Sequence, residues 1–103
     1  MTASHPLLSS EARVATDAAR RYLGQLCKHF QHKLPVVFDA RHGRIEFEAG
    51  SCELDAAPDA GMLVMRVFAS DEAALTRLED VVSRHLERFA FRDETKVRWA
   101  RSA

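Results

Sequence analysis

Two short stretches of the chain carry side chains that could bind a ligand or react with one. The first, residues 27–32, places the Cys27 thiol close to the imidazoles of His29 and His32. Thiolate and imidazole are ligands that zinc, copper and iron accept. On a helix Cys27 and His29 point in nearly opposite directions, whereas His29 and His32 share a face. At most the two histidines form a metal pair, which would need a further ligand such as His85 or Glu87.

An ordinary basic helix end is the alternative interpretation of this stretch. Cationic side chains complement the dipole at a helix C-terminus, and this end carries Lys28, His29, His32 and Lys33. Cys27 would then only pack in the core as a small apolar residue.

The second stretch is residues 85–92. His85 borders the apolar stripe of a predicted helix, where desolvation can shift the pKa of an imidazole. Together with Arg88 and Arg92 it could form an anion site in which His85 is a candidate general base. The alternative is an ordinary buried histidine, because no carboxylate partner is identifiable in the sequence. The predicted ligand-binding residues are His29, His32, His85, Arg88 and Arg92.

A third stretch is acidic. Glu46, Glu48, Glu53 and Asp55 are expected on one face of a hairpin, and no Lys or Arg occurs in residues 45–59. Close carboxylates could bind a hard cation or a basic partner, and the alternative is a solvated sheet face whose charge discourages aggregation. Arginines are concentrated on the last predicted helix instead. Because the acidic surface of one copy could pair with the basic surface of another, this separation of charge suggests a homodimer.

Alternating strand-like and helix-like segments must position these groups. Apolar residues recur at helical spacing in 17–32 and 70–92. The predicted strands cover 13–15, 36–38, 44–48, 52–55, 62–69 and 95–99. The order β-α-β-β-β-β-α-β predicts an α+β fold, a two-layer sandwich with a mostly antiparallel sheet of about six short strands and two helices on one face. Residues 1–10 are expected to form a flexible arm, and residues 11–103 a single α+β domain.

Composition excludes several classes of protein. Fifteen Lys and Arg balance fifteen Asp and Glu, so no net positive field favours nucleic-acid binding. No apolar run is long enough for a membrane span or a signal peptide, and the two cysteines fit a reducing cytoplasmic compartment. The major phosphate-binding, hydrolase and metalloprotease motifs are absent from the sequence, and no cofactor is indicated.

Several motifs resemble those of the small bacterial proteins grouped as domain of unknown function 2218. They are Arg21-Tyr22-Leu23, Leu26-Cys27-Lys28-His29-Phe30, His32-Lys33, Gly50-Ser51-Cys52-Glu53-Leu54 and His85-Leu86-Glu87-Arg88-Phe89-Ala90-Phe91-Arg92, within about residues 12–99. Members are found fused to or beside siderophore-interacting flavin reductases. The resemblance thus implies a link to siderophores and iron, with such a reductase as partner, and it supplies no catalytic assignment.

The leading prediction is therefore a non-enzymatic cytoplasmic binding or accessory module for an anionic or metal-bearing ligand. One alternative is a small enzyme that uses His85 as general base and Arg88 to bind an anion. Another is a structural domain that associates with itself through its sheet.

Overall fold

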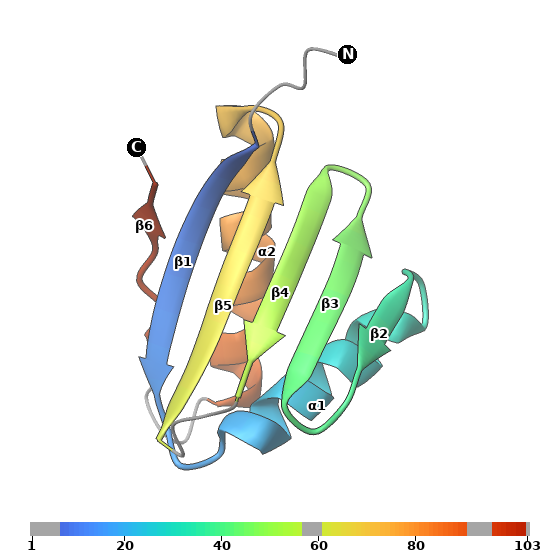
Figure 1. Cartoon of the computed structure of the whole chain (residues 1–103), viewed down its shortest axis with the longest axis vertical. Helices are drawn as coiled ribbons and strands as arrows, with labels where there is room; N and C mark the ends of the chain where they lie inside the picture. Colours follow the sequence, from blue (N-terminus) through green and yellow to red (C-terminus); the bar gives the residue numbers. More distant parts are fainter. Residues whose placement is uncertain (1–6, 57–60, 91–95, 103) are drawn as a thin grey trace.

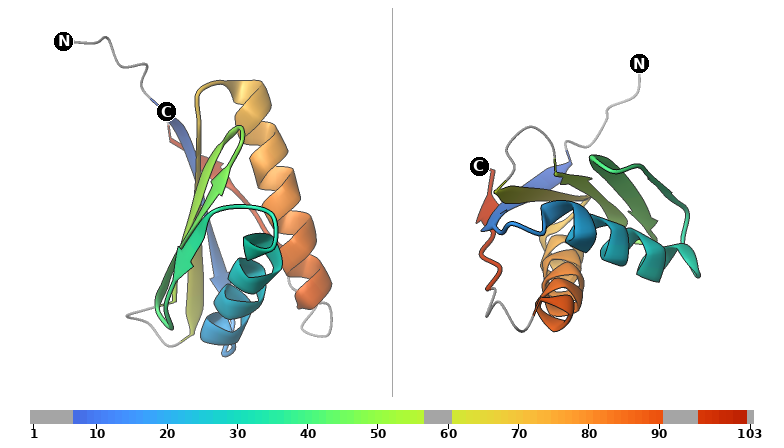
Figure 2. Two further views of the ribbon diagram at one scale, coloured as in Figure 1. Left: turned by 90° about the vertical axis from the view of Figure 1, so that its right-hand side faces the viewer. Right: turned by 90° about the horizontal axis from the view of Figure 1, so that it is seen from below.

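A computed structural model describes residues 7–56, 61–90 and 96–102 of the chain. Its elements are β1 (Leu8–Ala15), α1 (Ala19–Gln31), β2 (Val36–Phe38), β3 (His42–Phe47), β4 (Gly50–Asp55), β5 (Met62–Ala69), α2 (Glu72–Phe89) and β6 (Ala100–Arg101). The strands form one sheet in the order β2-β3-β4-β5-β1-β6, and every neighbouring pair is antiparallel. Both helices lie on one face of it (Figures 1 and 2). The predicted α+β sandwich is confirmed.

The core lies between the sheet and the two helices. Along β5 every second residue is buried, and Leu63, Met65, Val67 and Ala69 are completely enclosed. From α2 the stripe that covers them consists of Leu75, Leu78, Val82 and Leu86. Each such side chain contributes about 1.5–3 kcal/mol on burial. Neither described helix is long and apolar enough to cross a membrane.

The start of α2 is set by an aspartate. Asp71 is the N-cap, and its Oδ1 accepts a hydrogen bond from the Ala74 backbone N–H at 2.7 Å. This bond satisfies one of the backbone donors that the first turn leaves free. The helix therefore begins at Glu72, slightly later than the predicted start at Ser70.

The first strand is longer than predicted. It begins at Leu8 and pairs with β5 along its whole length, from Leu8 opposite Ala69 to Ala15 opposite Met62. Residues 8–10, which were expected in the flexible arm, therefore belong to the sheet, while residues 1–6 of that arm lie outside the described residues. Ser10 is buried in β1, although the composition of residues 1–10 predicted a solvated segment.

The last strand is shorter and lies later than the predicted 95–99. Within the described residues 96–102, Ala100 and Arg101 pair with β1 as a strand, and the Ser102 backbone N–H donates to the Ser9 carbonyl oxygen; Thr95 lies outside the described residues. The preceding residues dock on α2 through side chains instead: the Trp99 indole N–H donates to Ser83 Oγ at 2.6 Å, and the Val97 backbone N–H donates to a Glu87 carboxylate oxygen. Val97 and Trp99 face the core together, as the alternation predicted.

Two glycines should respond oppositely to alanine. At Gly50 an added Cβ would lie 2.0 Å from the Phe68 carbonyl oxygen, whereas nothing lies within 4 Å of a Cβ at Gly24. Gly50→Ala should lower the free energy of unfolding by about 2 kcal/mol or more through overpacking. Gly24→Ala should raise it by about 0.5–1 kcal/mol because alanine favours the helix. Urea denaturation measures both, and equal effects would contradict the packing around Gly50.

Candidate functional site

The C-terminal halves of the two helices bring two of the predicted site residues together. The rings of His29 on α1 and His85 on α2 are 4.7 Å apart between centroids and tilted by 49°. Phe89, one turn after His85, approaches the His29 ring edge-on at 5.9 Å. The predicted convergence of His29 and His85 is therefore present in the structure.

Phe30 anchors this arrangement to the sheet. Its side chain is buried, and its ring lies 4.8 Å from that of His85 and 5.2 Å from that of Phe47 in β3. Aromatic pairs in such tilted or edge-on geometry contribute about 0.5–1.5 kcal/mol each beyond their burial. Because His29 adjoins Phe30 in α1, the packing of Phe30 also places the His29 ring at the helix–helix contact.

A backbone hydrogen bond orients the His85 ring. Its Nδ1 lies 2.6 Å from the carbonyl oxygen of Val81, one turn earlier in α2. A carbonyl only accepts, so Nδ1 carries a proton and donates, and in the neutral ring Nε2 keeps its lone pair. Nε2 is thus the atom of His85 that can take a proton or bind a ligand. Catalytic histidines often have a carboxylate at the other nitrogen, where His85 has a backbone carbonyl.

The electrostatic surroundings of His29 are cationic. Partial desolvation of the ring lowers the pKa of His29, and nearby positive charges lower it further. These charges belong to His85, His32, Arg88 and Lys33. We call these five residues the imidazole site.

The remaining predicted residues lie at the edge of this site or outside the description. His32 is the exposed C-cap of α1, and Arg88 is exposed in the last turn of α2. Arg92 lies outside the described residues. Two basic side chains thus border the paired rings at the C-terminal ends of the two helices, where positive charge complements the helix dipole.

The described residues do not assemble a metal centre. Among them, no three His, Cys, Asp or Glu side chains are grouped so that they could hold a metal ion. Cys27 is completely buried, and burial raises the pKa of its thiol to about 11, so it stays protonated and packs in the core. The positive charges around His29 would also repel a bare cation. The same charges suit an anion.

The predicted acidic surface is neutralised in space. Glu46 and Glu53 share the open face of the sheet with Arg44, which contacts both of their carboxylates. Arg66 of β5 stands beside Glu53 in the sheet, and Glu48 lies in the turn between β3 and β4. The prediction that Glu46 and Glu53 share a face is confirmed, and the placement of Glu48 on that face was wrong. The face is not purely acidic, because Arg44 just precedes the acidic stretch and Arg66 comes from a strand whose neighbours the sequence does not show.

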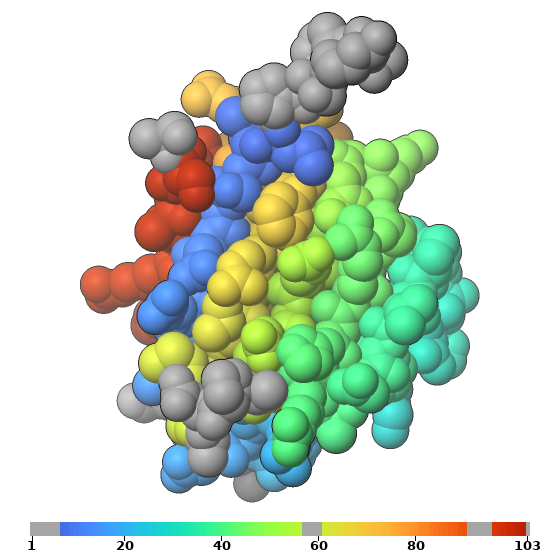
Figure 3. All heavy atoms as spheres, in the orientation of Figure 1, coloured from blue at the N-terminus to red at the C-terminus, as the bar shows by residue number. Residues whose placement is uncertain are grey.

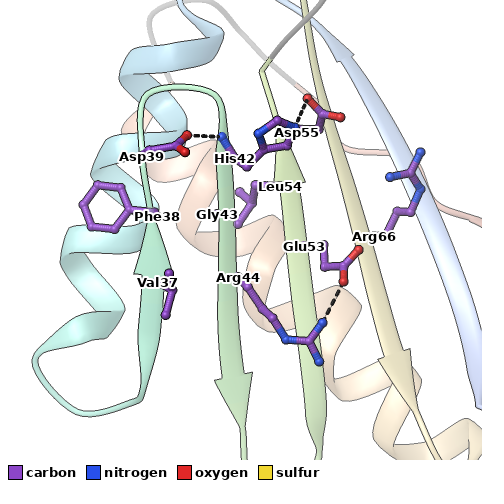
Figure 4. A pocket seen from close by; sticks show the side chains of 10 residues that line it. All are labelled: Val37, Phe38, Asp39, His42, Gly43, Arg44, Glu53, Leu54, Asp55 and Arg66. Carbon is purple, nitrogen blue, oxygen red and sulfur yellow. Dashed lines mark hydrogen bonds and ion pairs between the residues drawn. The ribbon is translucent and has the colours of Figure 1, made fainter.

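A hollow that the sequence did not predict lies on the same open face (Figure 4). Its volume is about 660 Å³. It is lined by Val37, Phe38, Asp39, His42, Gly43, Arg44, Glu53, Leu54, Asp55 and Arg66. His42 Nε2 lies 3.6 Å from Asp55 Oδ1 at one end, and Arg44 bonds Glu53 nearby at 2.7 Å. The one indication of this hollow in the sequence was the alternation of His42, Arg44 and Glu46, which places polar side chains on one face of β3.

Asp39 shapes the rim of this hollow. Its Oδ1 accepts hydrogen bonds from the backbone N–H groups of Arg41 and His42, and these bonds lower the pKa of the Asp39 carboxyl. The turn between β2 and β3 therefore holds a carboxylate in its charged form at the edge of the sheet face.

Comparisons with known proteins identify one family and one solved structure. The family described as "Uncharacterized protein conserved in bacteria (DUF2218)" matches residues 11–100. The NMR structure of PA4090 from Pseudomonas aeruginosa is similar, with 32% sequence identity and a TM-score of 0.75, over 90% of this chain and 95% of that one. No curated protein matches the chain.

Removing one cation should change the titration of His29. Arg88→Gln takes away a positive charge that disfavours the protonated ring, so the pKa of His29 should rise toward its usual value. NMR observation of the imidazole signals against pH measures this change. Arg84→Gln is the matched control, because Arg84 is paired with Asp80 at 3.1 Å and is not among the groups that shift His29. An unchanged His29 in the Arg88 variant would contradict the proximity of the two groups.

Proposed function

The chain belongs to the DUF2218 family, and we propose that it is a non-enzymatic binding module whose imidazole site takes a small anion that bears carboxylates. The observation that supports this proposal is the sign of the charges at His29: among the described residues, each side chain whose charge shifts the pKa of His29 is a histidine, lysine or arginine, and each lowers it. Basic side chains grouped beside apolar walls are a favourable surface for an anion.

Three residues of the imidazole site and the neighbouring Phe89 have separate roles in this proposal. Arg88 offers a planar fork that can bond both oxygens of a carboxylate. His85 Nε2 and the His29 ring bond the anion when they carry a proton, and Phe89 supplies an apolar wall beside them. Because the pKa of His29 is lowered in the free protein, an anion that favours the charged ring should bind together with a proton.

The ligand and partner within this proposal come from the family resemblance. A ferric siderophore or its carboxylate arms fits the proposed anion class, and a siderophore-interacting flavin reductase is the proposed partner. The proposed location is the cytoplasm, since Cys27 and Cys52 are both free thiols in the structure, which suits a reducing compartment.

A small enzyme with His85 as general base and Arg88 as anion binder is the second candidate. The hydrogen bond to Val81 favours it, because this bond holds the ring and leaves the lone pair on Nε2. His85→Gln separates the two candidates: the amide can still donate to an anion, so binding should persist, whereas a reaction that needs a base would stop.

Citrate is a suitable probe of the anion site. Titration of the full chain with citrate should shift the imidazole NMR signals of His29 and His85 and should raise the pKa of His29. A hydrogen bond to a charged group contributes about 1.5–3 kcal/mol, so Arg88→Gln or His29→Ala should weaken binding by roughly 10- to 100-fold. Binding should also strengthen as the pH falls toward the usual pKa of histidine.

His42→Asn is the matched control for the citrate experiment. His42 is an exposed histidine on the open face of the sheet, away from the two helices. This variant should bind citrate as the unmodified chain does. Shifts at His42 alone, or equal weakening in all three variants, would contradict the proposed site.

A further inference from the structure

Four charged residues form one row across the open face of the sheet. In register they are Arg44 of β3, Glu53 of β4, Arg66 of β5 and Glu11 of β1. We call this row the charge ladder. Its signs alternate along the row, and its outer pairs are bonded, Arg44 to Glu53 at 2.7 Å and Arg66 to Glu11 at 2.8 Å.

The face that carries the ladder is broad and open to solvent. Both helices pack on the opposite side, and Figure 3 shows the side chains of β1, β5, β4 and β3 next to one another at the surface. All four ladder side chains are partly exposed, with exposed fractions from 31% to 49%. Apolar side chains of β5, from Met62, Val64 and Phe68, are only half-buried beside them.

We propose that this face binds a second copy of the chain about a two-fold axis that runs parallel to the strands, between β4 and β5. This rotation exchanges β4 with β5 and β3 with β1. Glu53 then faces Arg66 of the partner subunit, and Arg44 faces Glu11 of the partner subunit. All four ladder positions meet an opposite charge, because an alternating row of even length is complementary to its own reversal.

The ladder also discriminates between the two ways of stacking the face on itself. A two-fold axis perpendicular to the strands and along the ladder would place each residue opposite its own copy, so Arg44 would face arginine and Glu53 would face glutamate. Like charges in register across an interface are costly. The strand-parallel axis is therefore the arrangement that the charges favour.

The dimensions of the face suit a modest dimer. Four strands spaced about 4.8 Å apart and about 25 Å long cover roughly 500 Å² in plane, and side-chain relief adds to this area. A standard interface buries about 800 Å² per partner. Packed sheets cross at about 30°, which displaces the ends of the ladder by only about 4 Å, within the reach of an arginine. Val64 and Phe68 of β5 lie next to the axis, opposite β4 of the partner, so apolar side chains of both copies line the centre of the interface.

The hollow supplies a second element of complementarity. The proposed rotation brings β1 of the partner over β3, so Arg13 of the partner subunit lies above the hollow. Within one chain the Arg13 side chain is 65% exposed and contacts Glu11 at 2.8 Å, so it would exchange this contact for the hollow. The hollow presents the carboxylates of Asp39 and Asp55, the latter beside His42. A long cationic side chain would thus enter an opening bordered by acids, independently of the proposed anion site.

Charge reversals can test the axis directly. Glu53→Arg and Arg66→Glu should each weaken the dimer, because each places two pairs of like charges across the interface. The dissociation constant of the dimer should rise at least about tenfold. Mixing equal amounts of the two variants should restore a dimer, since the substituted position of one chain then faces the substituted position of the other, which carries the opposite charge, and the native Arg66 and Glu53 of the two chains also face each other. Sedimentation equilibrium at low salt measures all three samples.

The double variant E53R/R66E separates contacts between chains from contacts within one. Inside a chain it places like charges side by side at both ends of the ladder, yet between two copies every position again faces an opposite charge. It should dimerise. Glu48→Arg and Arg77→Glu are matched controls with the same charge changes at exposed positions outside the ladder, and both should dimerise normally. Circular dichroism confirms that each variant is folded.

Several outcomes would overturn this proposal. The unmodified chain could remain a monomer at millimolar concentration and low salt. The control variants could dissociate as readily as the ladder variants. The mixture of single variants could also stay monomeric although the unmodified chain dimerises, which would place the interface on another face of the molecule. None of these results would affect the citrate titration, so the two proposals stand or fall separately.

Discussion

Burial of one face of the sheet under two helices is the constraint on which the rest of the structure depends. β5, in the middle of the sheet, alternates between completely buried residues such as Leu63 and Val67 and half-buried residues on the open side. The inner residues need an apolar cover, and the stripes of α1 and α2 provide it. Each helix must therefore lie on the same face, and the two helices must contact each other.

That contact decides the chemistry at the ends of the helices. Positive charge is favourable at the C-terminus of each helix. Because the C-terminal halves of α1 and α2 contact each other, the basic side chains of both helices lie on the same surface. His29, His85 and Arg88 consequently share a surface without a described carboxylate that shifts His29. The buried ring of Phe30 holds the two histidines at this contact.

The opposite face of the sheet follows a different electrostatic pattern. Charged residues on the outward side of several strands face water, and the antiparallel register sets acids and bases side by side. Arg44 contacts Glu46 and Glu53 of the acidic stretch, whereas Arg66 contacts Glu11 and lies in register opposite Glu53. One molecule thus carries a surface of basic side chains at the helix ends and a surface of alternating charges on the sheet.

The order of the elements, the buried stripes and the two-layer class could be predicted from the amino-acid sequence, because apolar periodicity is a local property of each segment. It did not reveal that residues 8–10 join β1, since serines give no apolar signal, or that Trp99 docks on Ser83 of α2 rather than in a strand. Only the tertiary structure decided that His29 meets His85 and that Arg66 stands beside Glu53. Those neighbours depend on which strands pair and where the helices cross, and both are set by packing between segments that are distant in the chain.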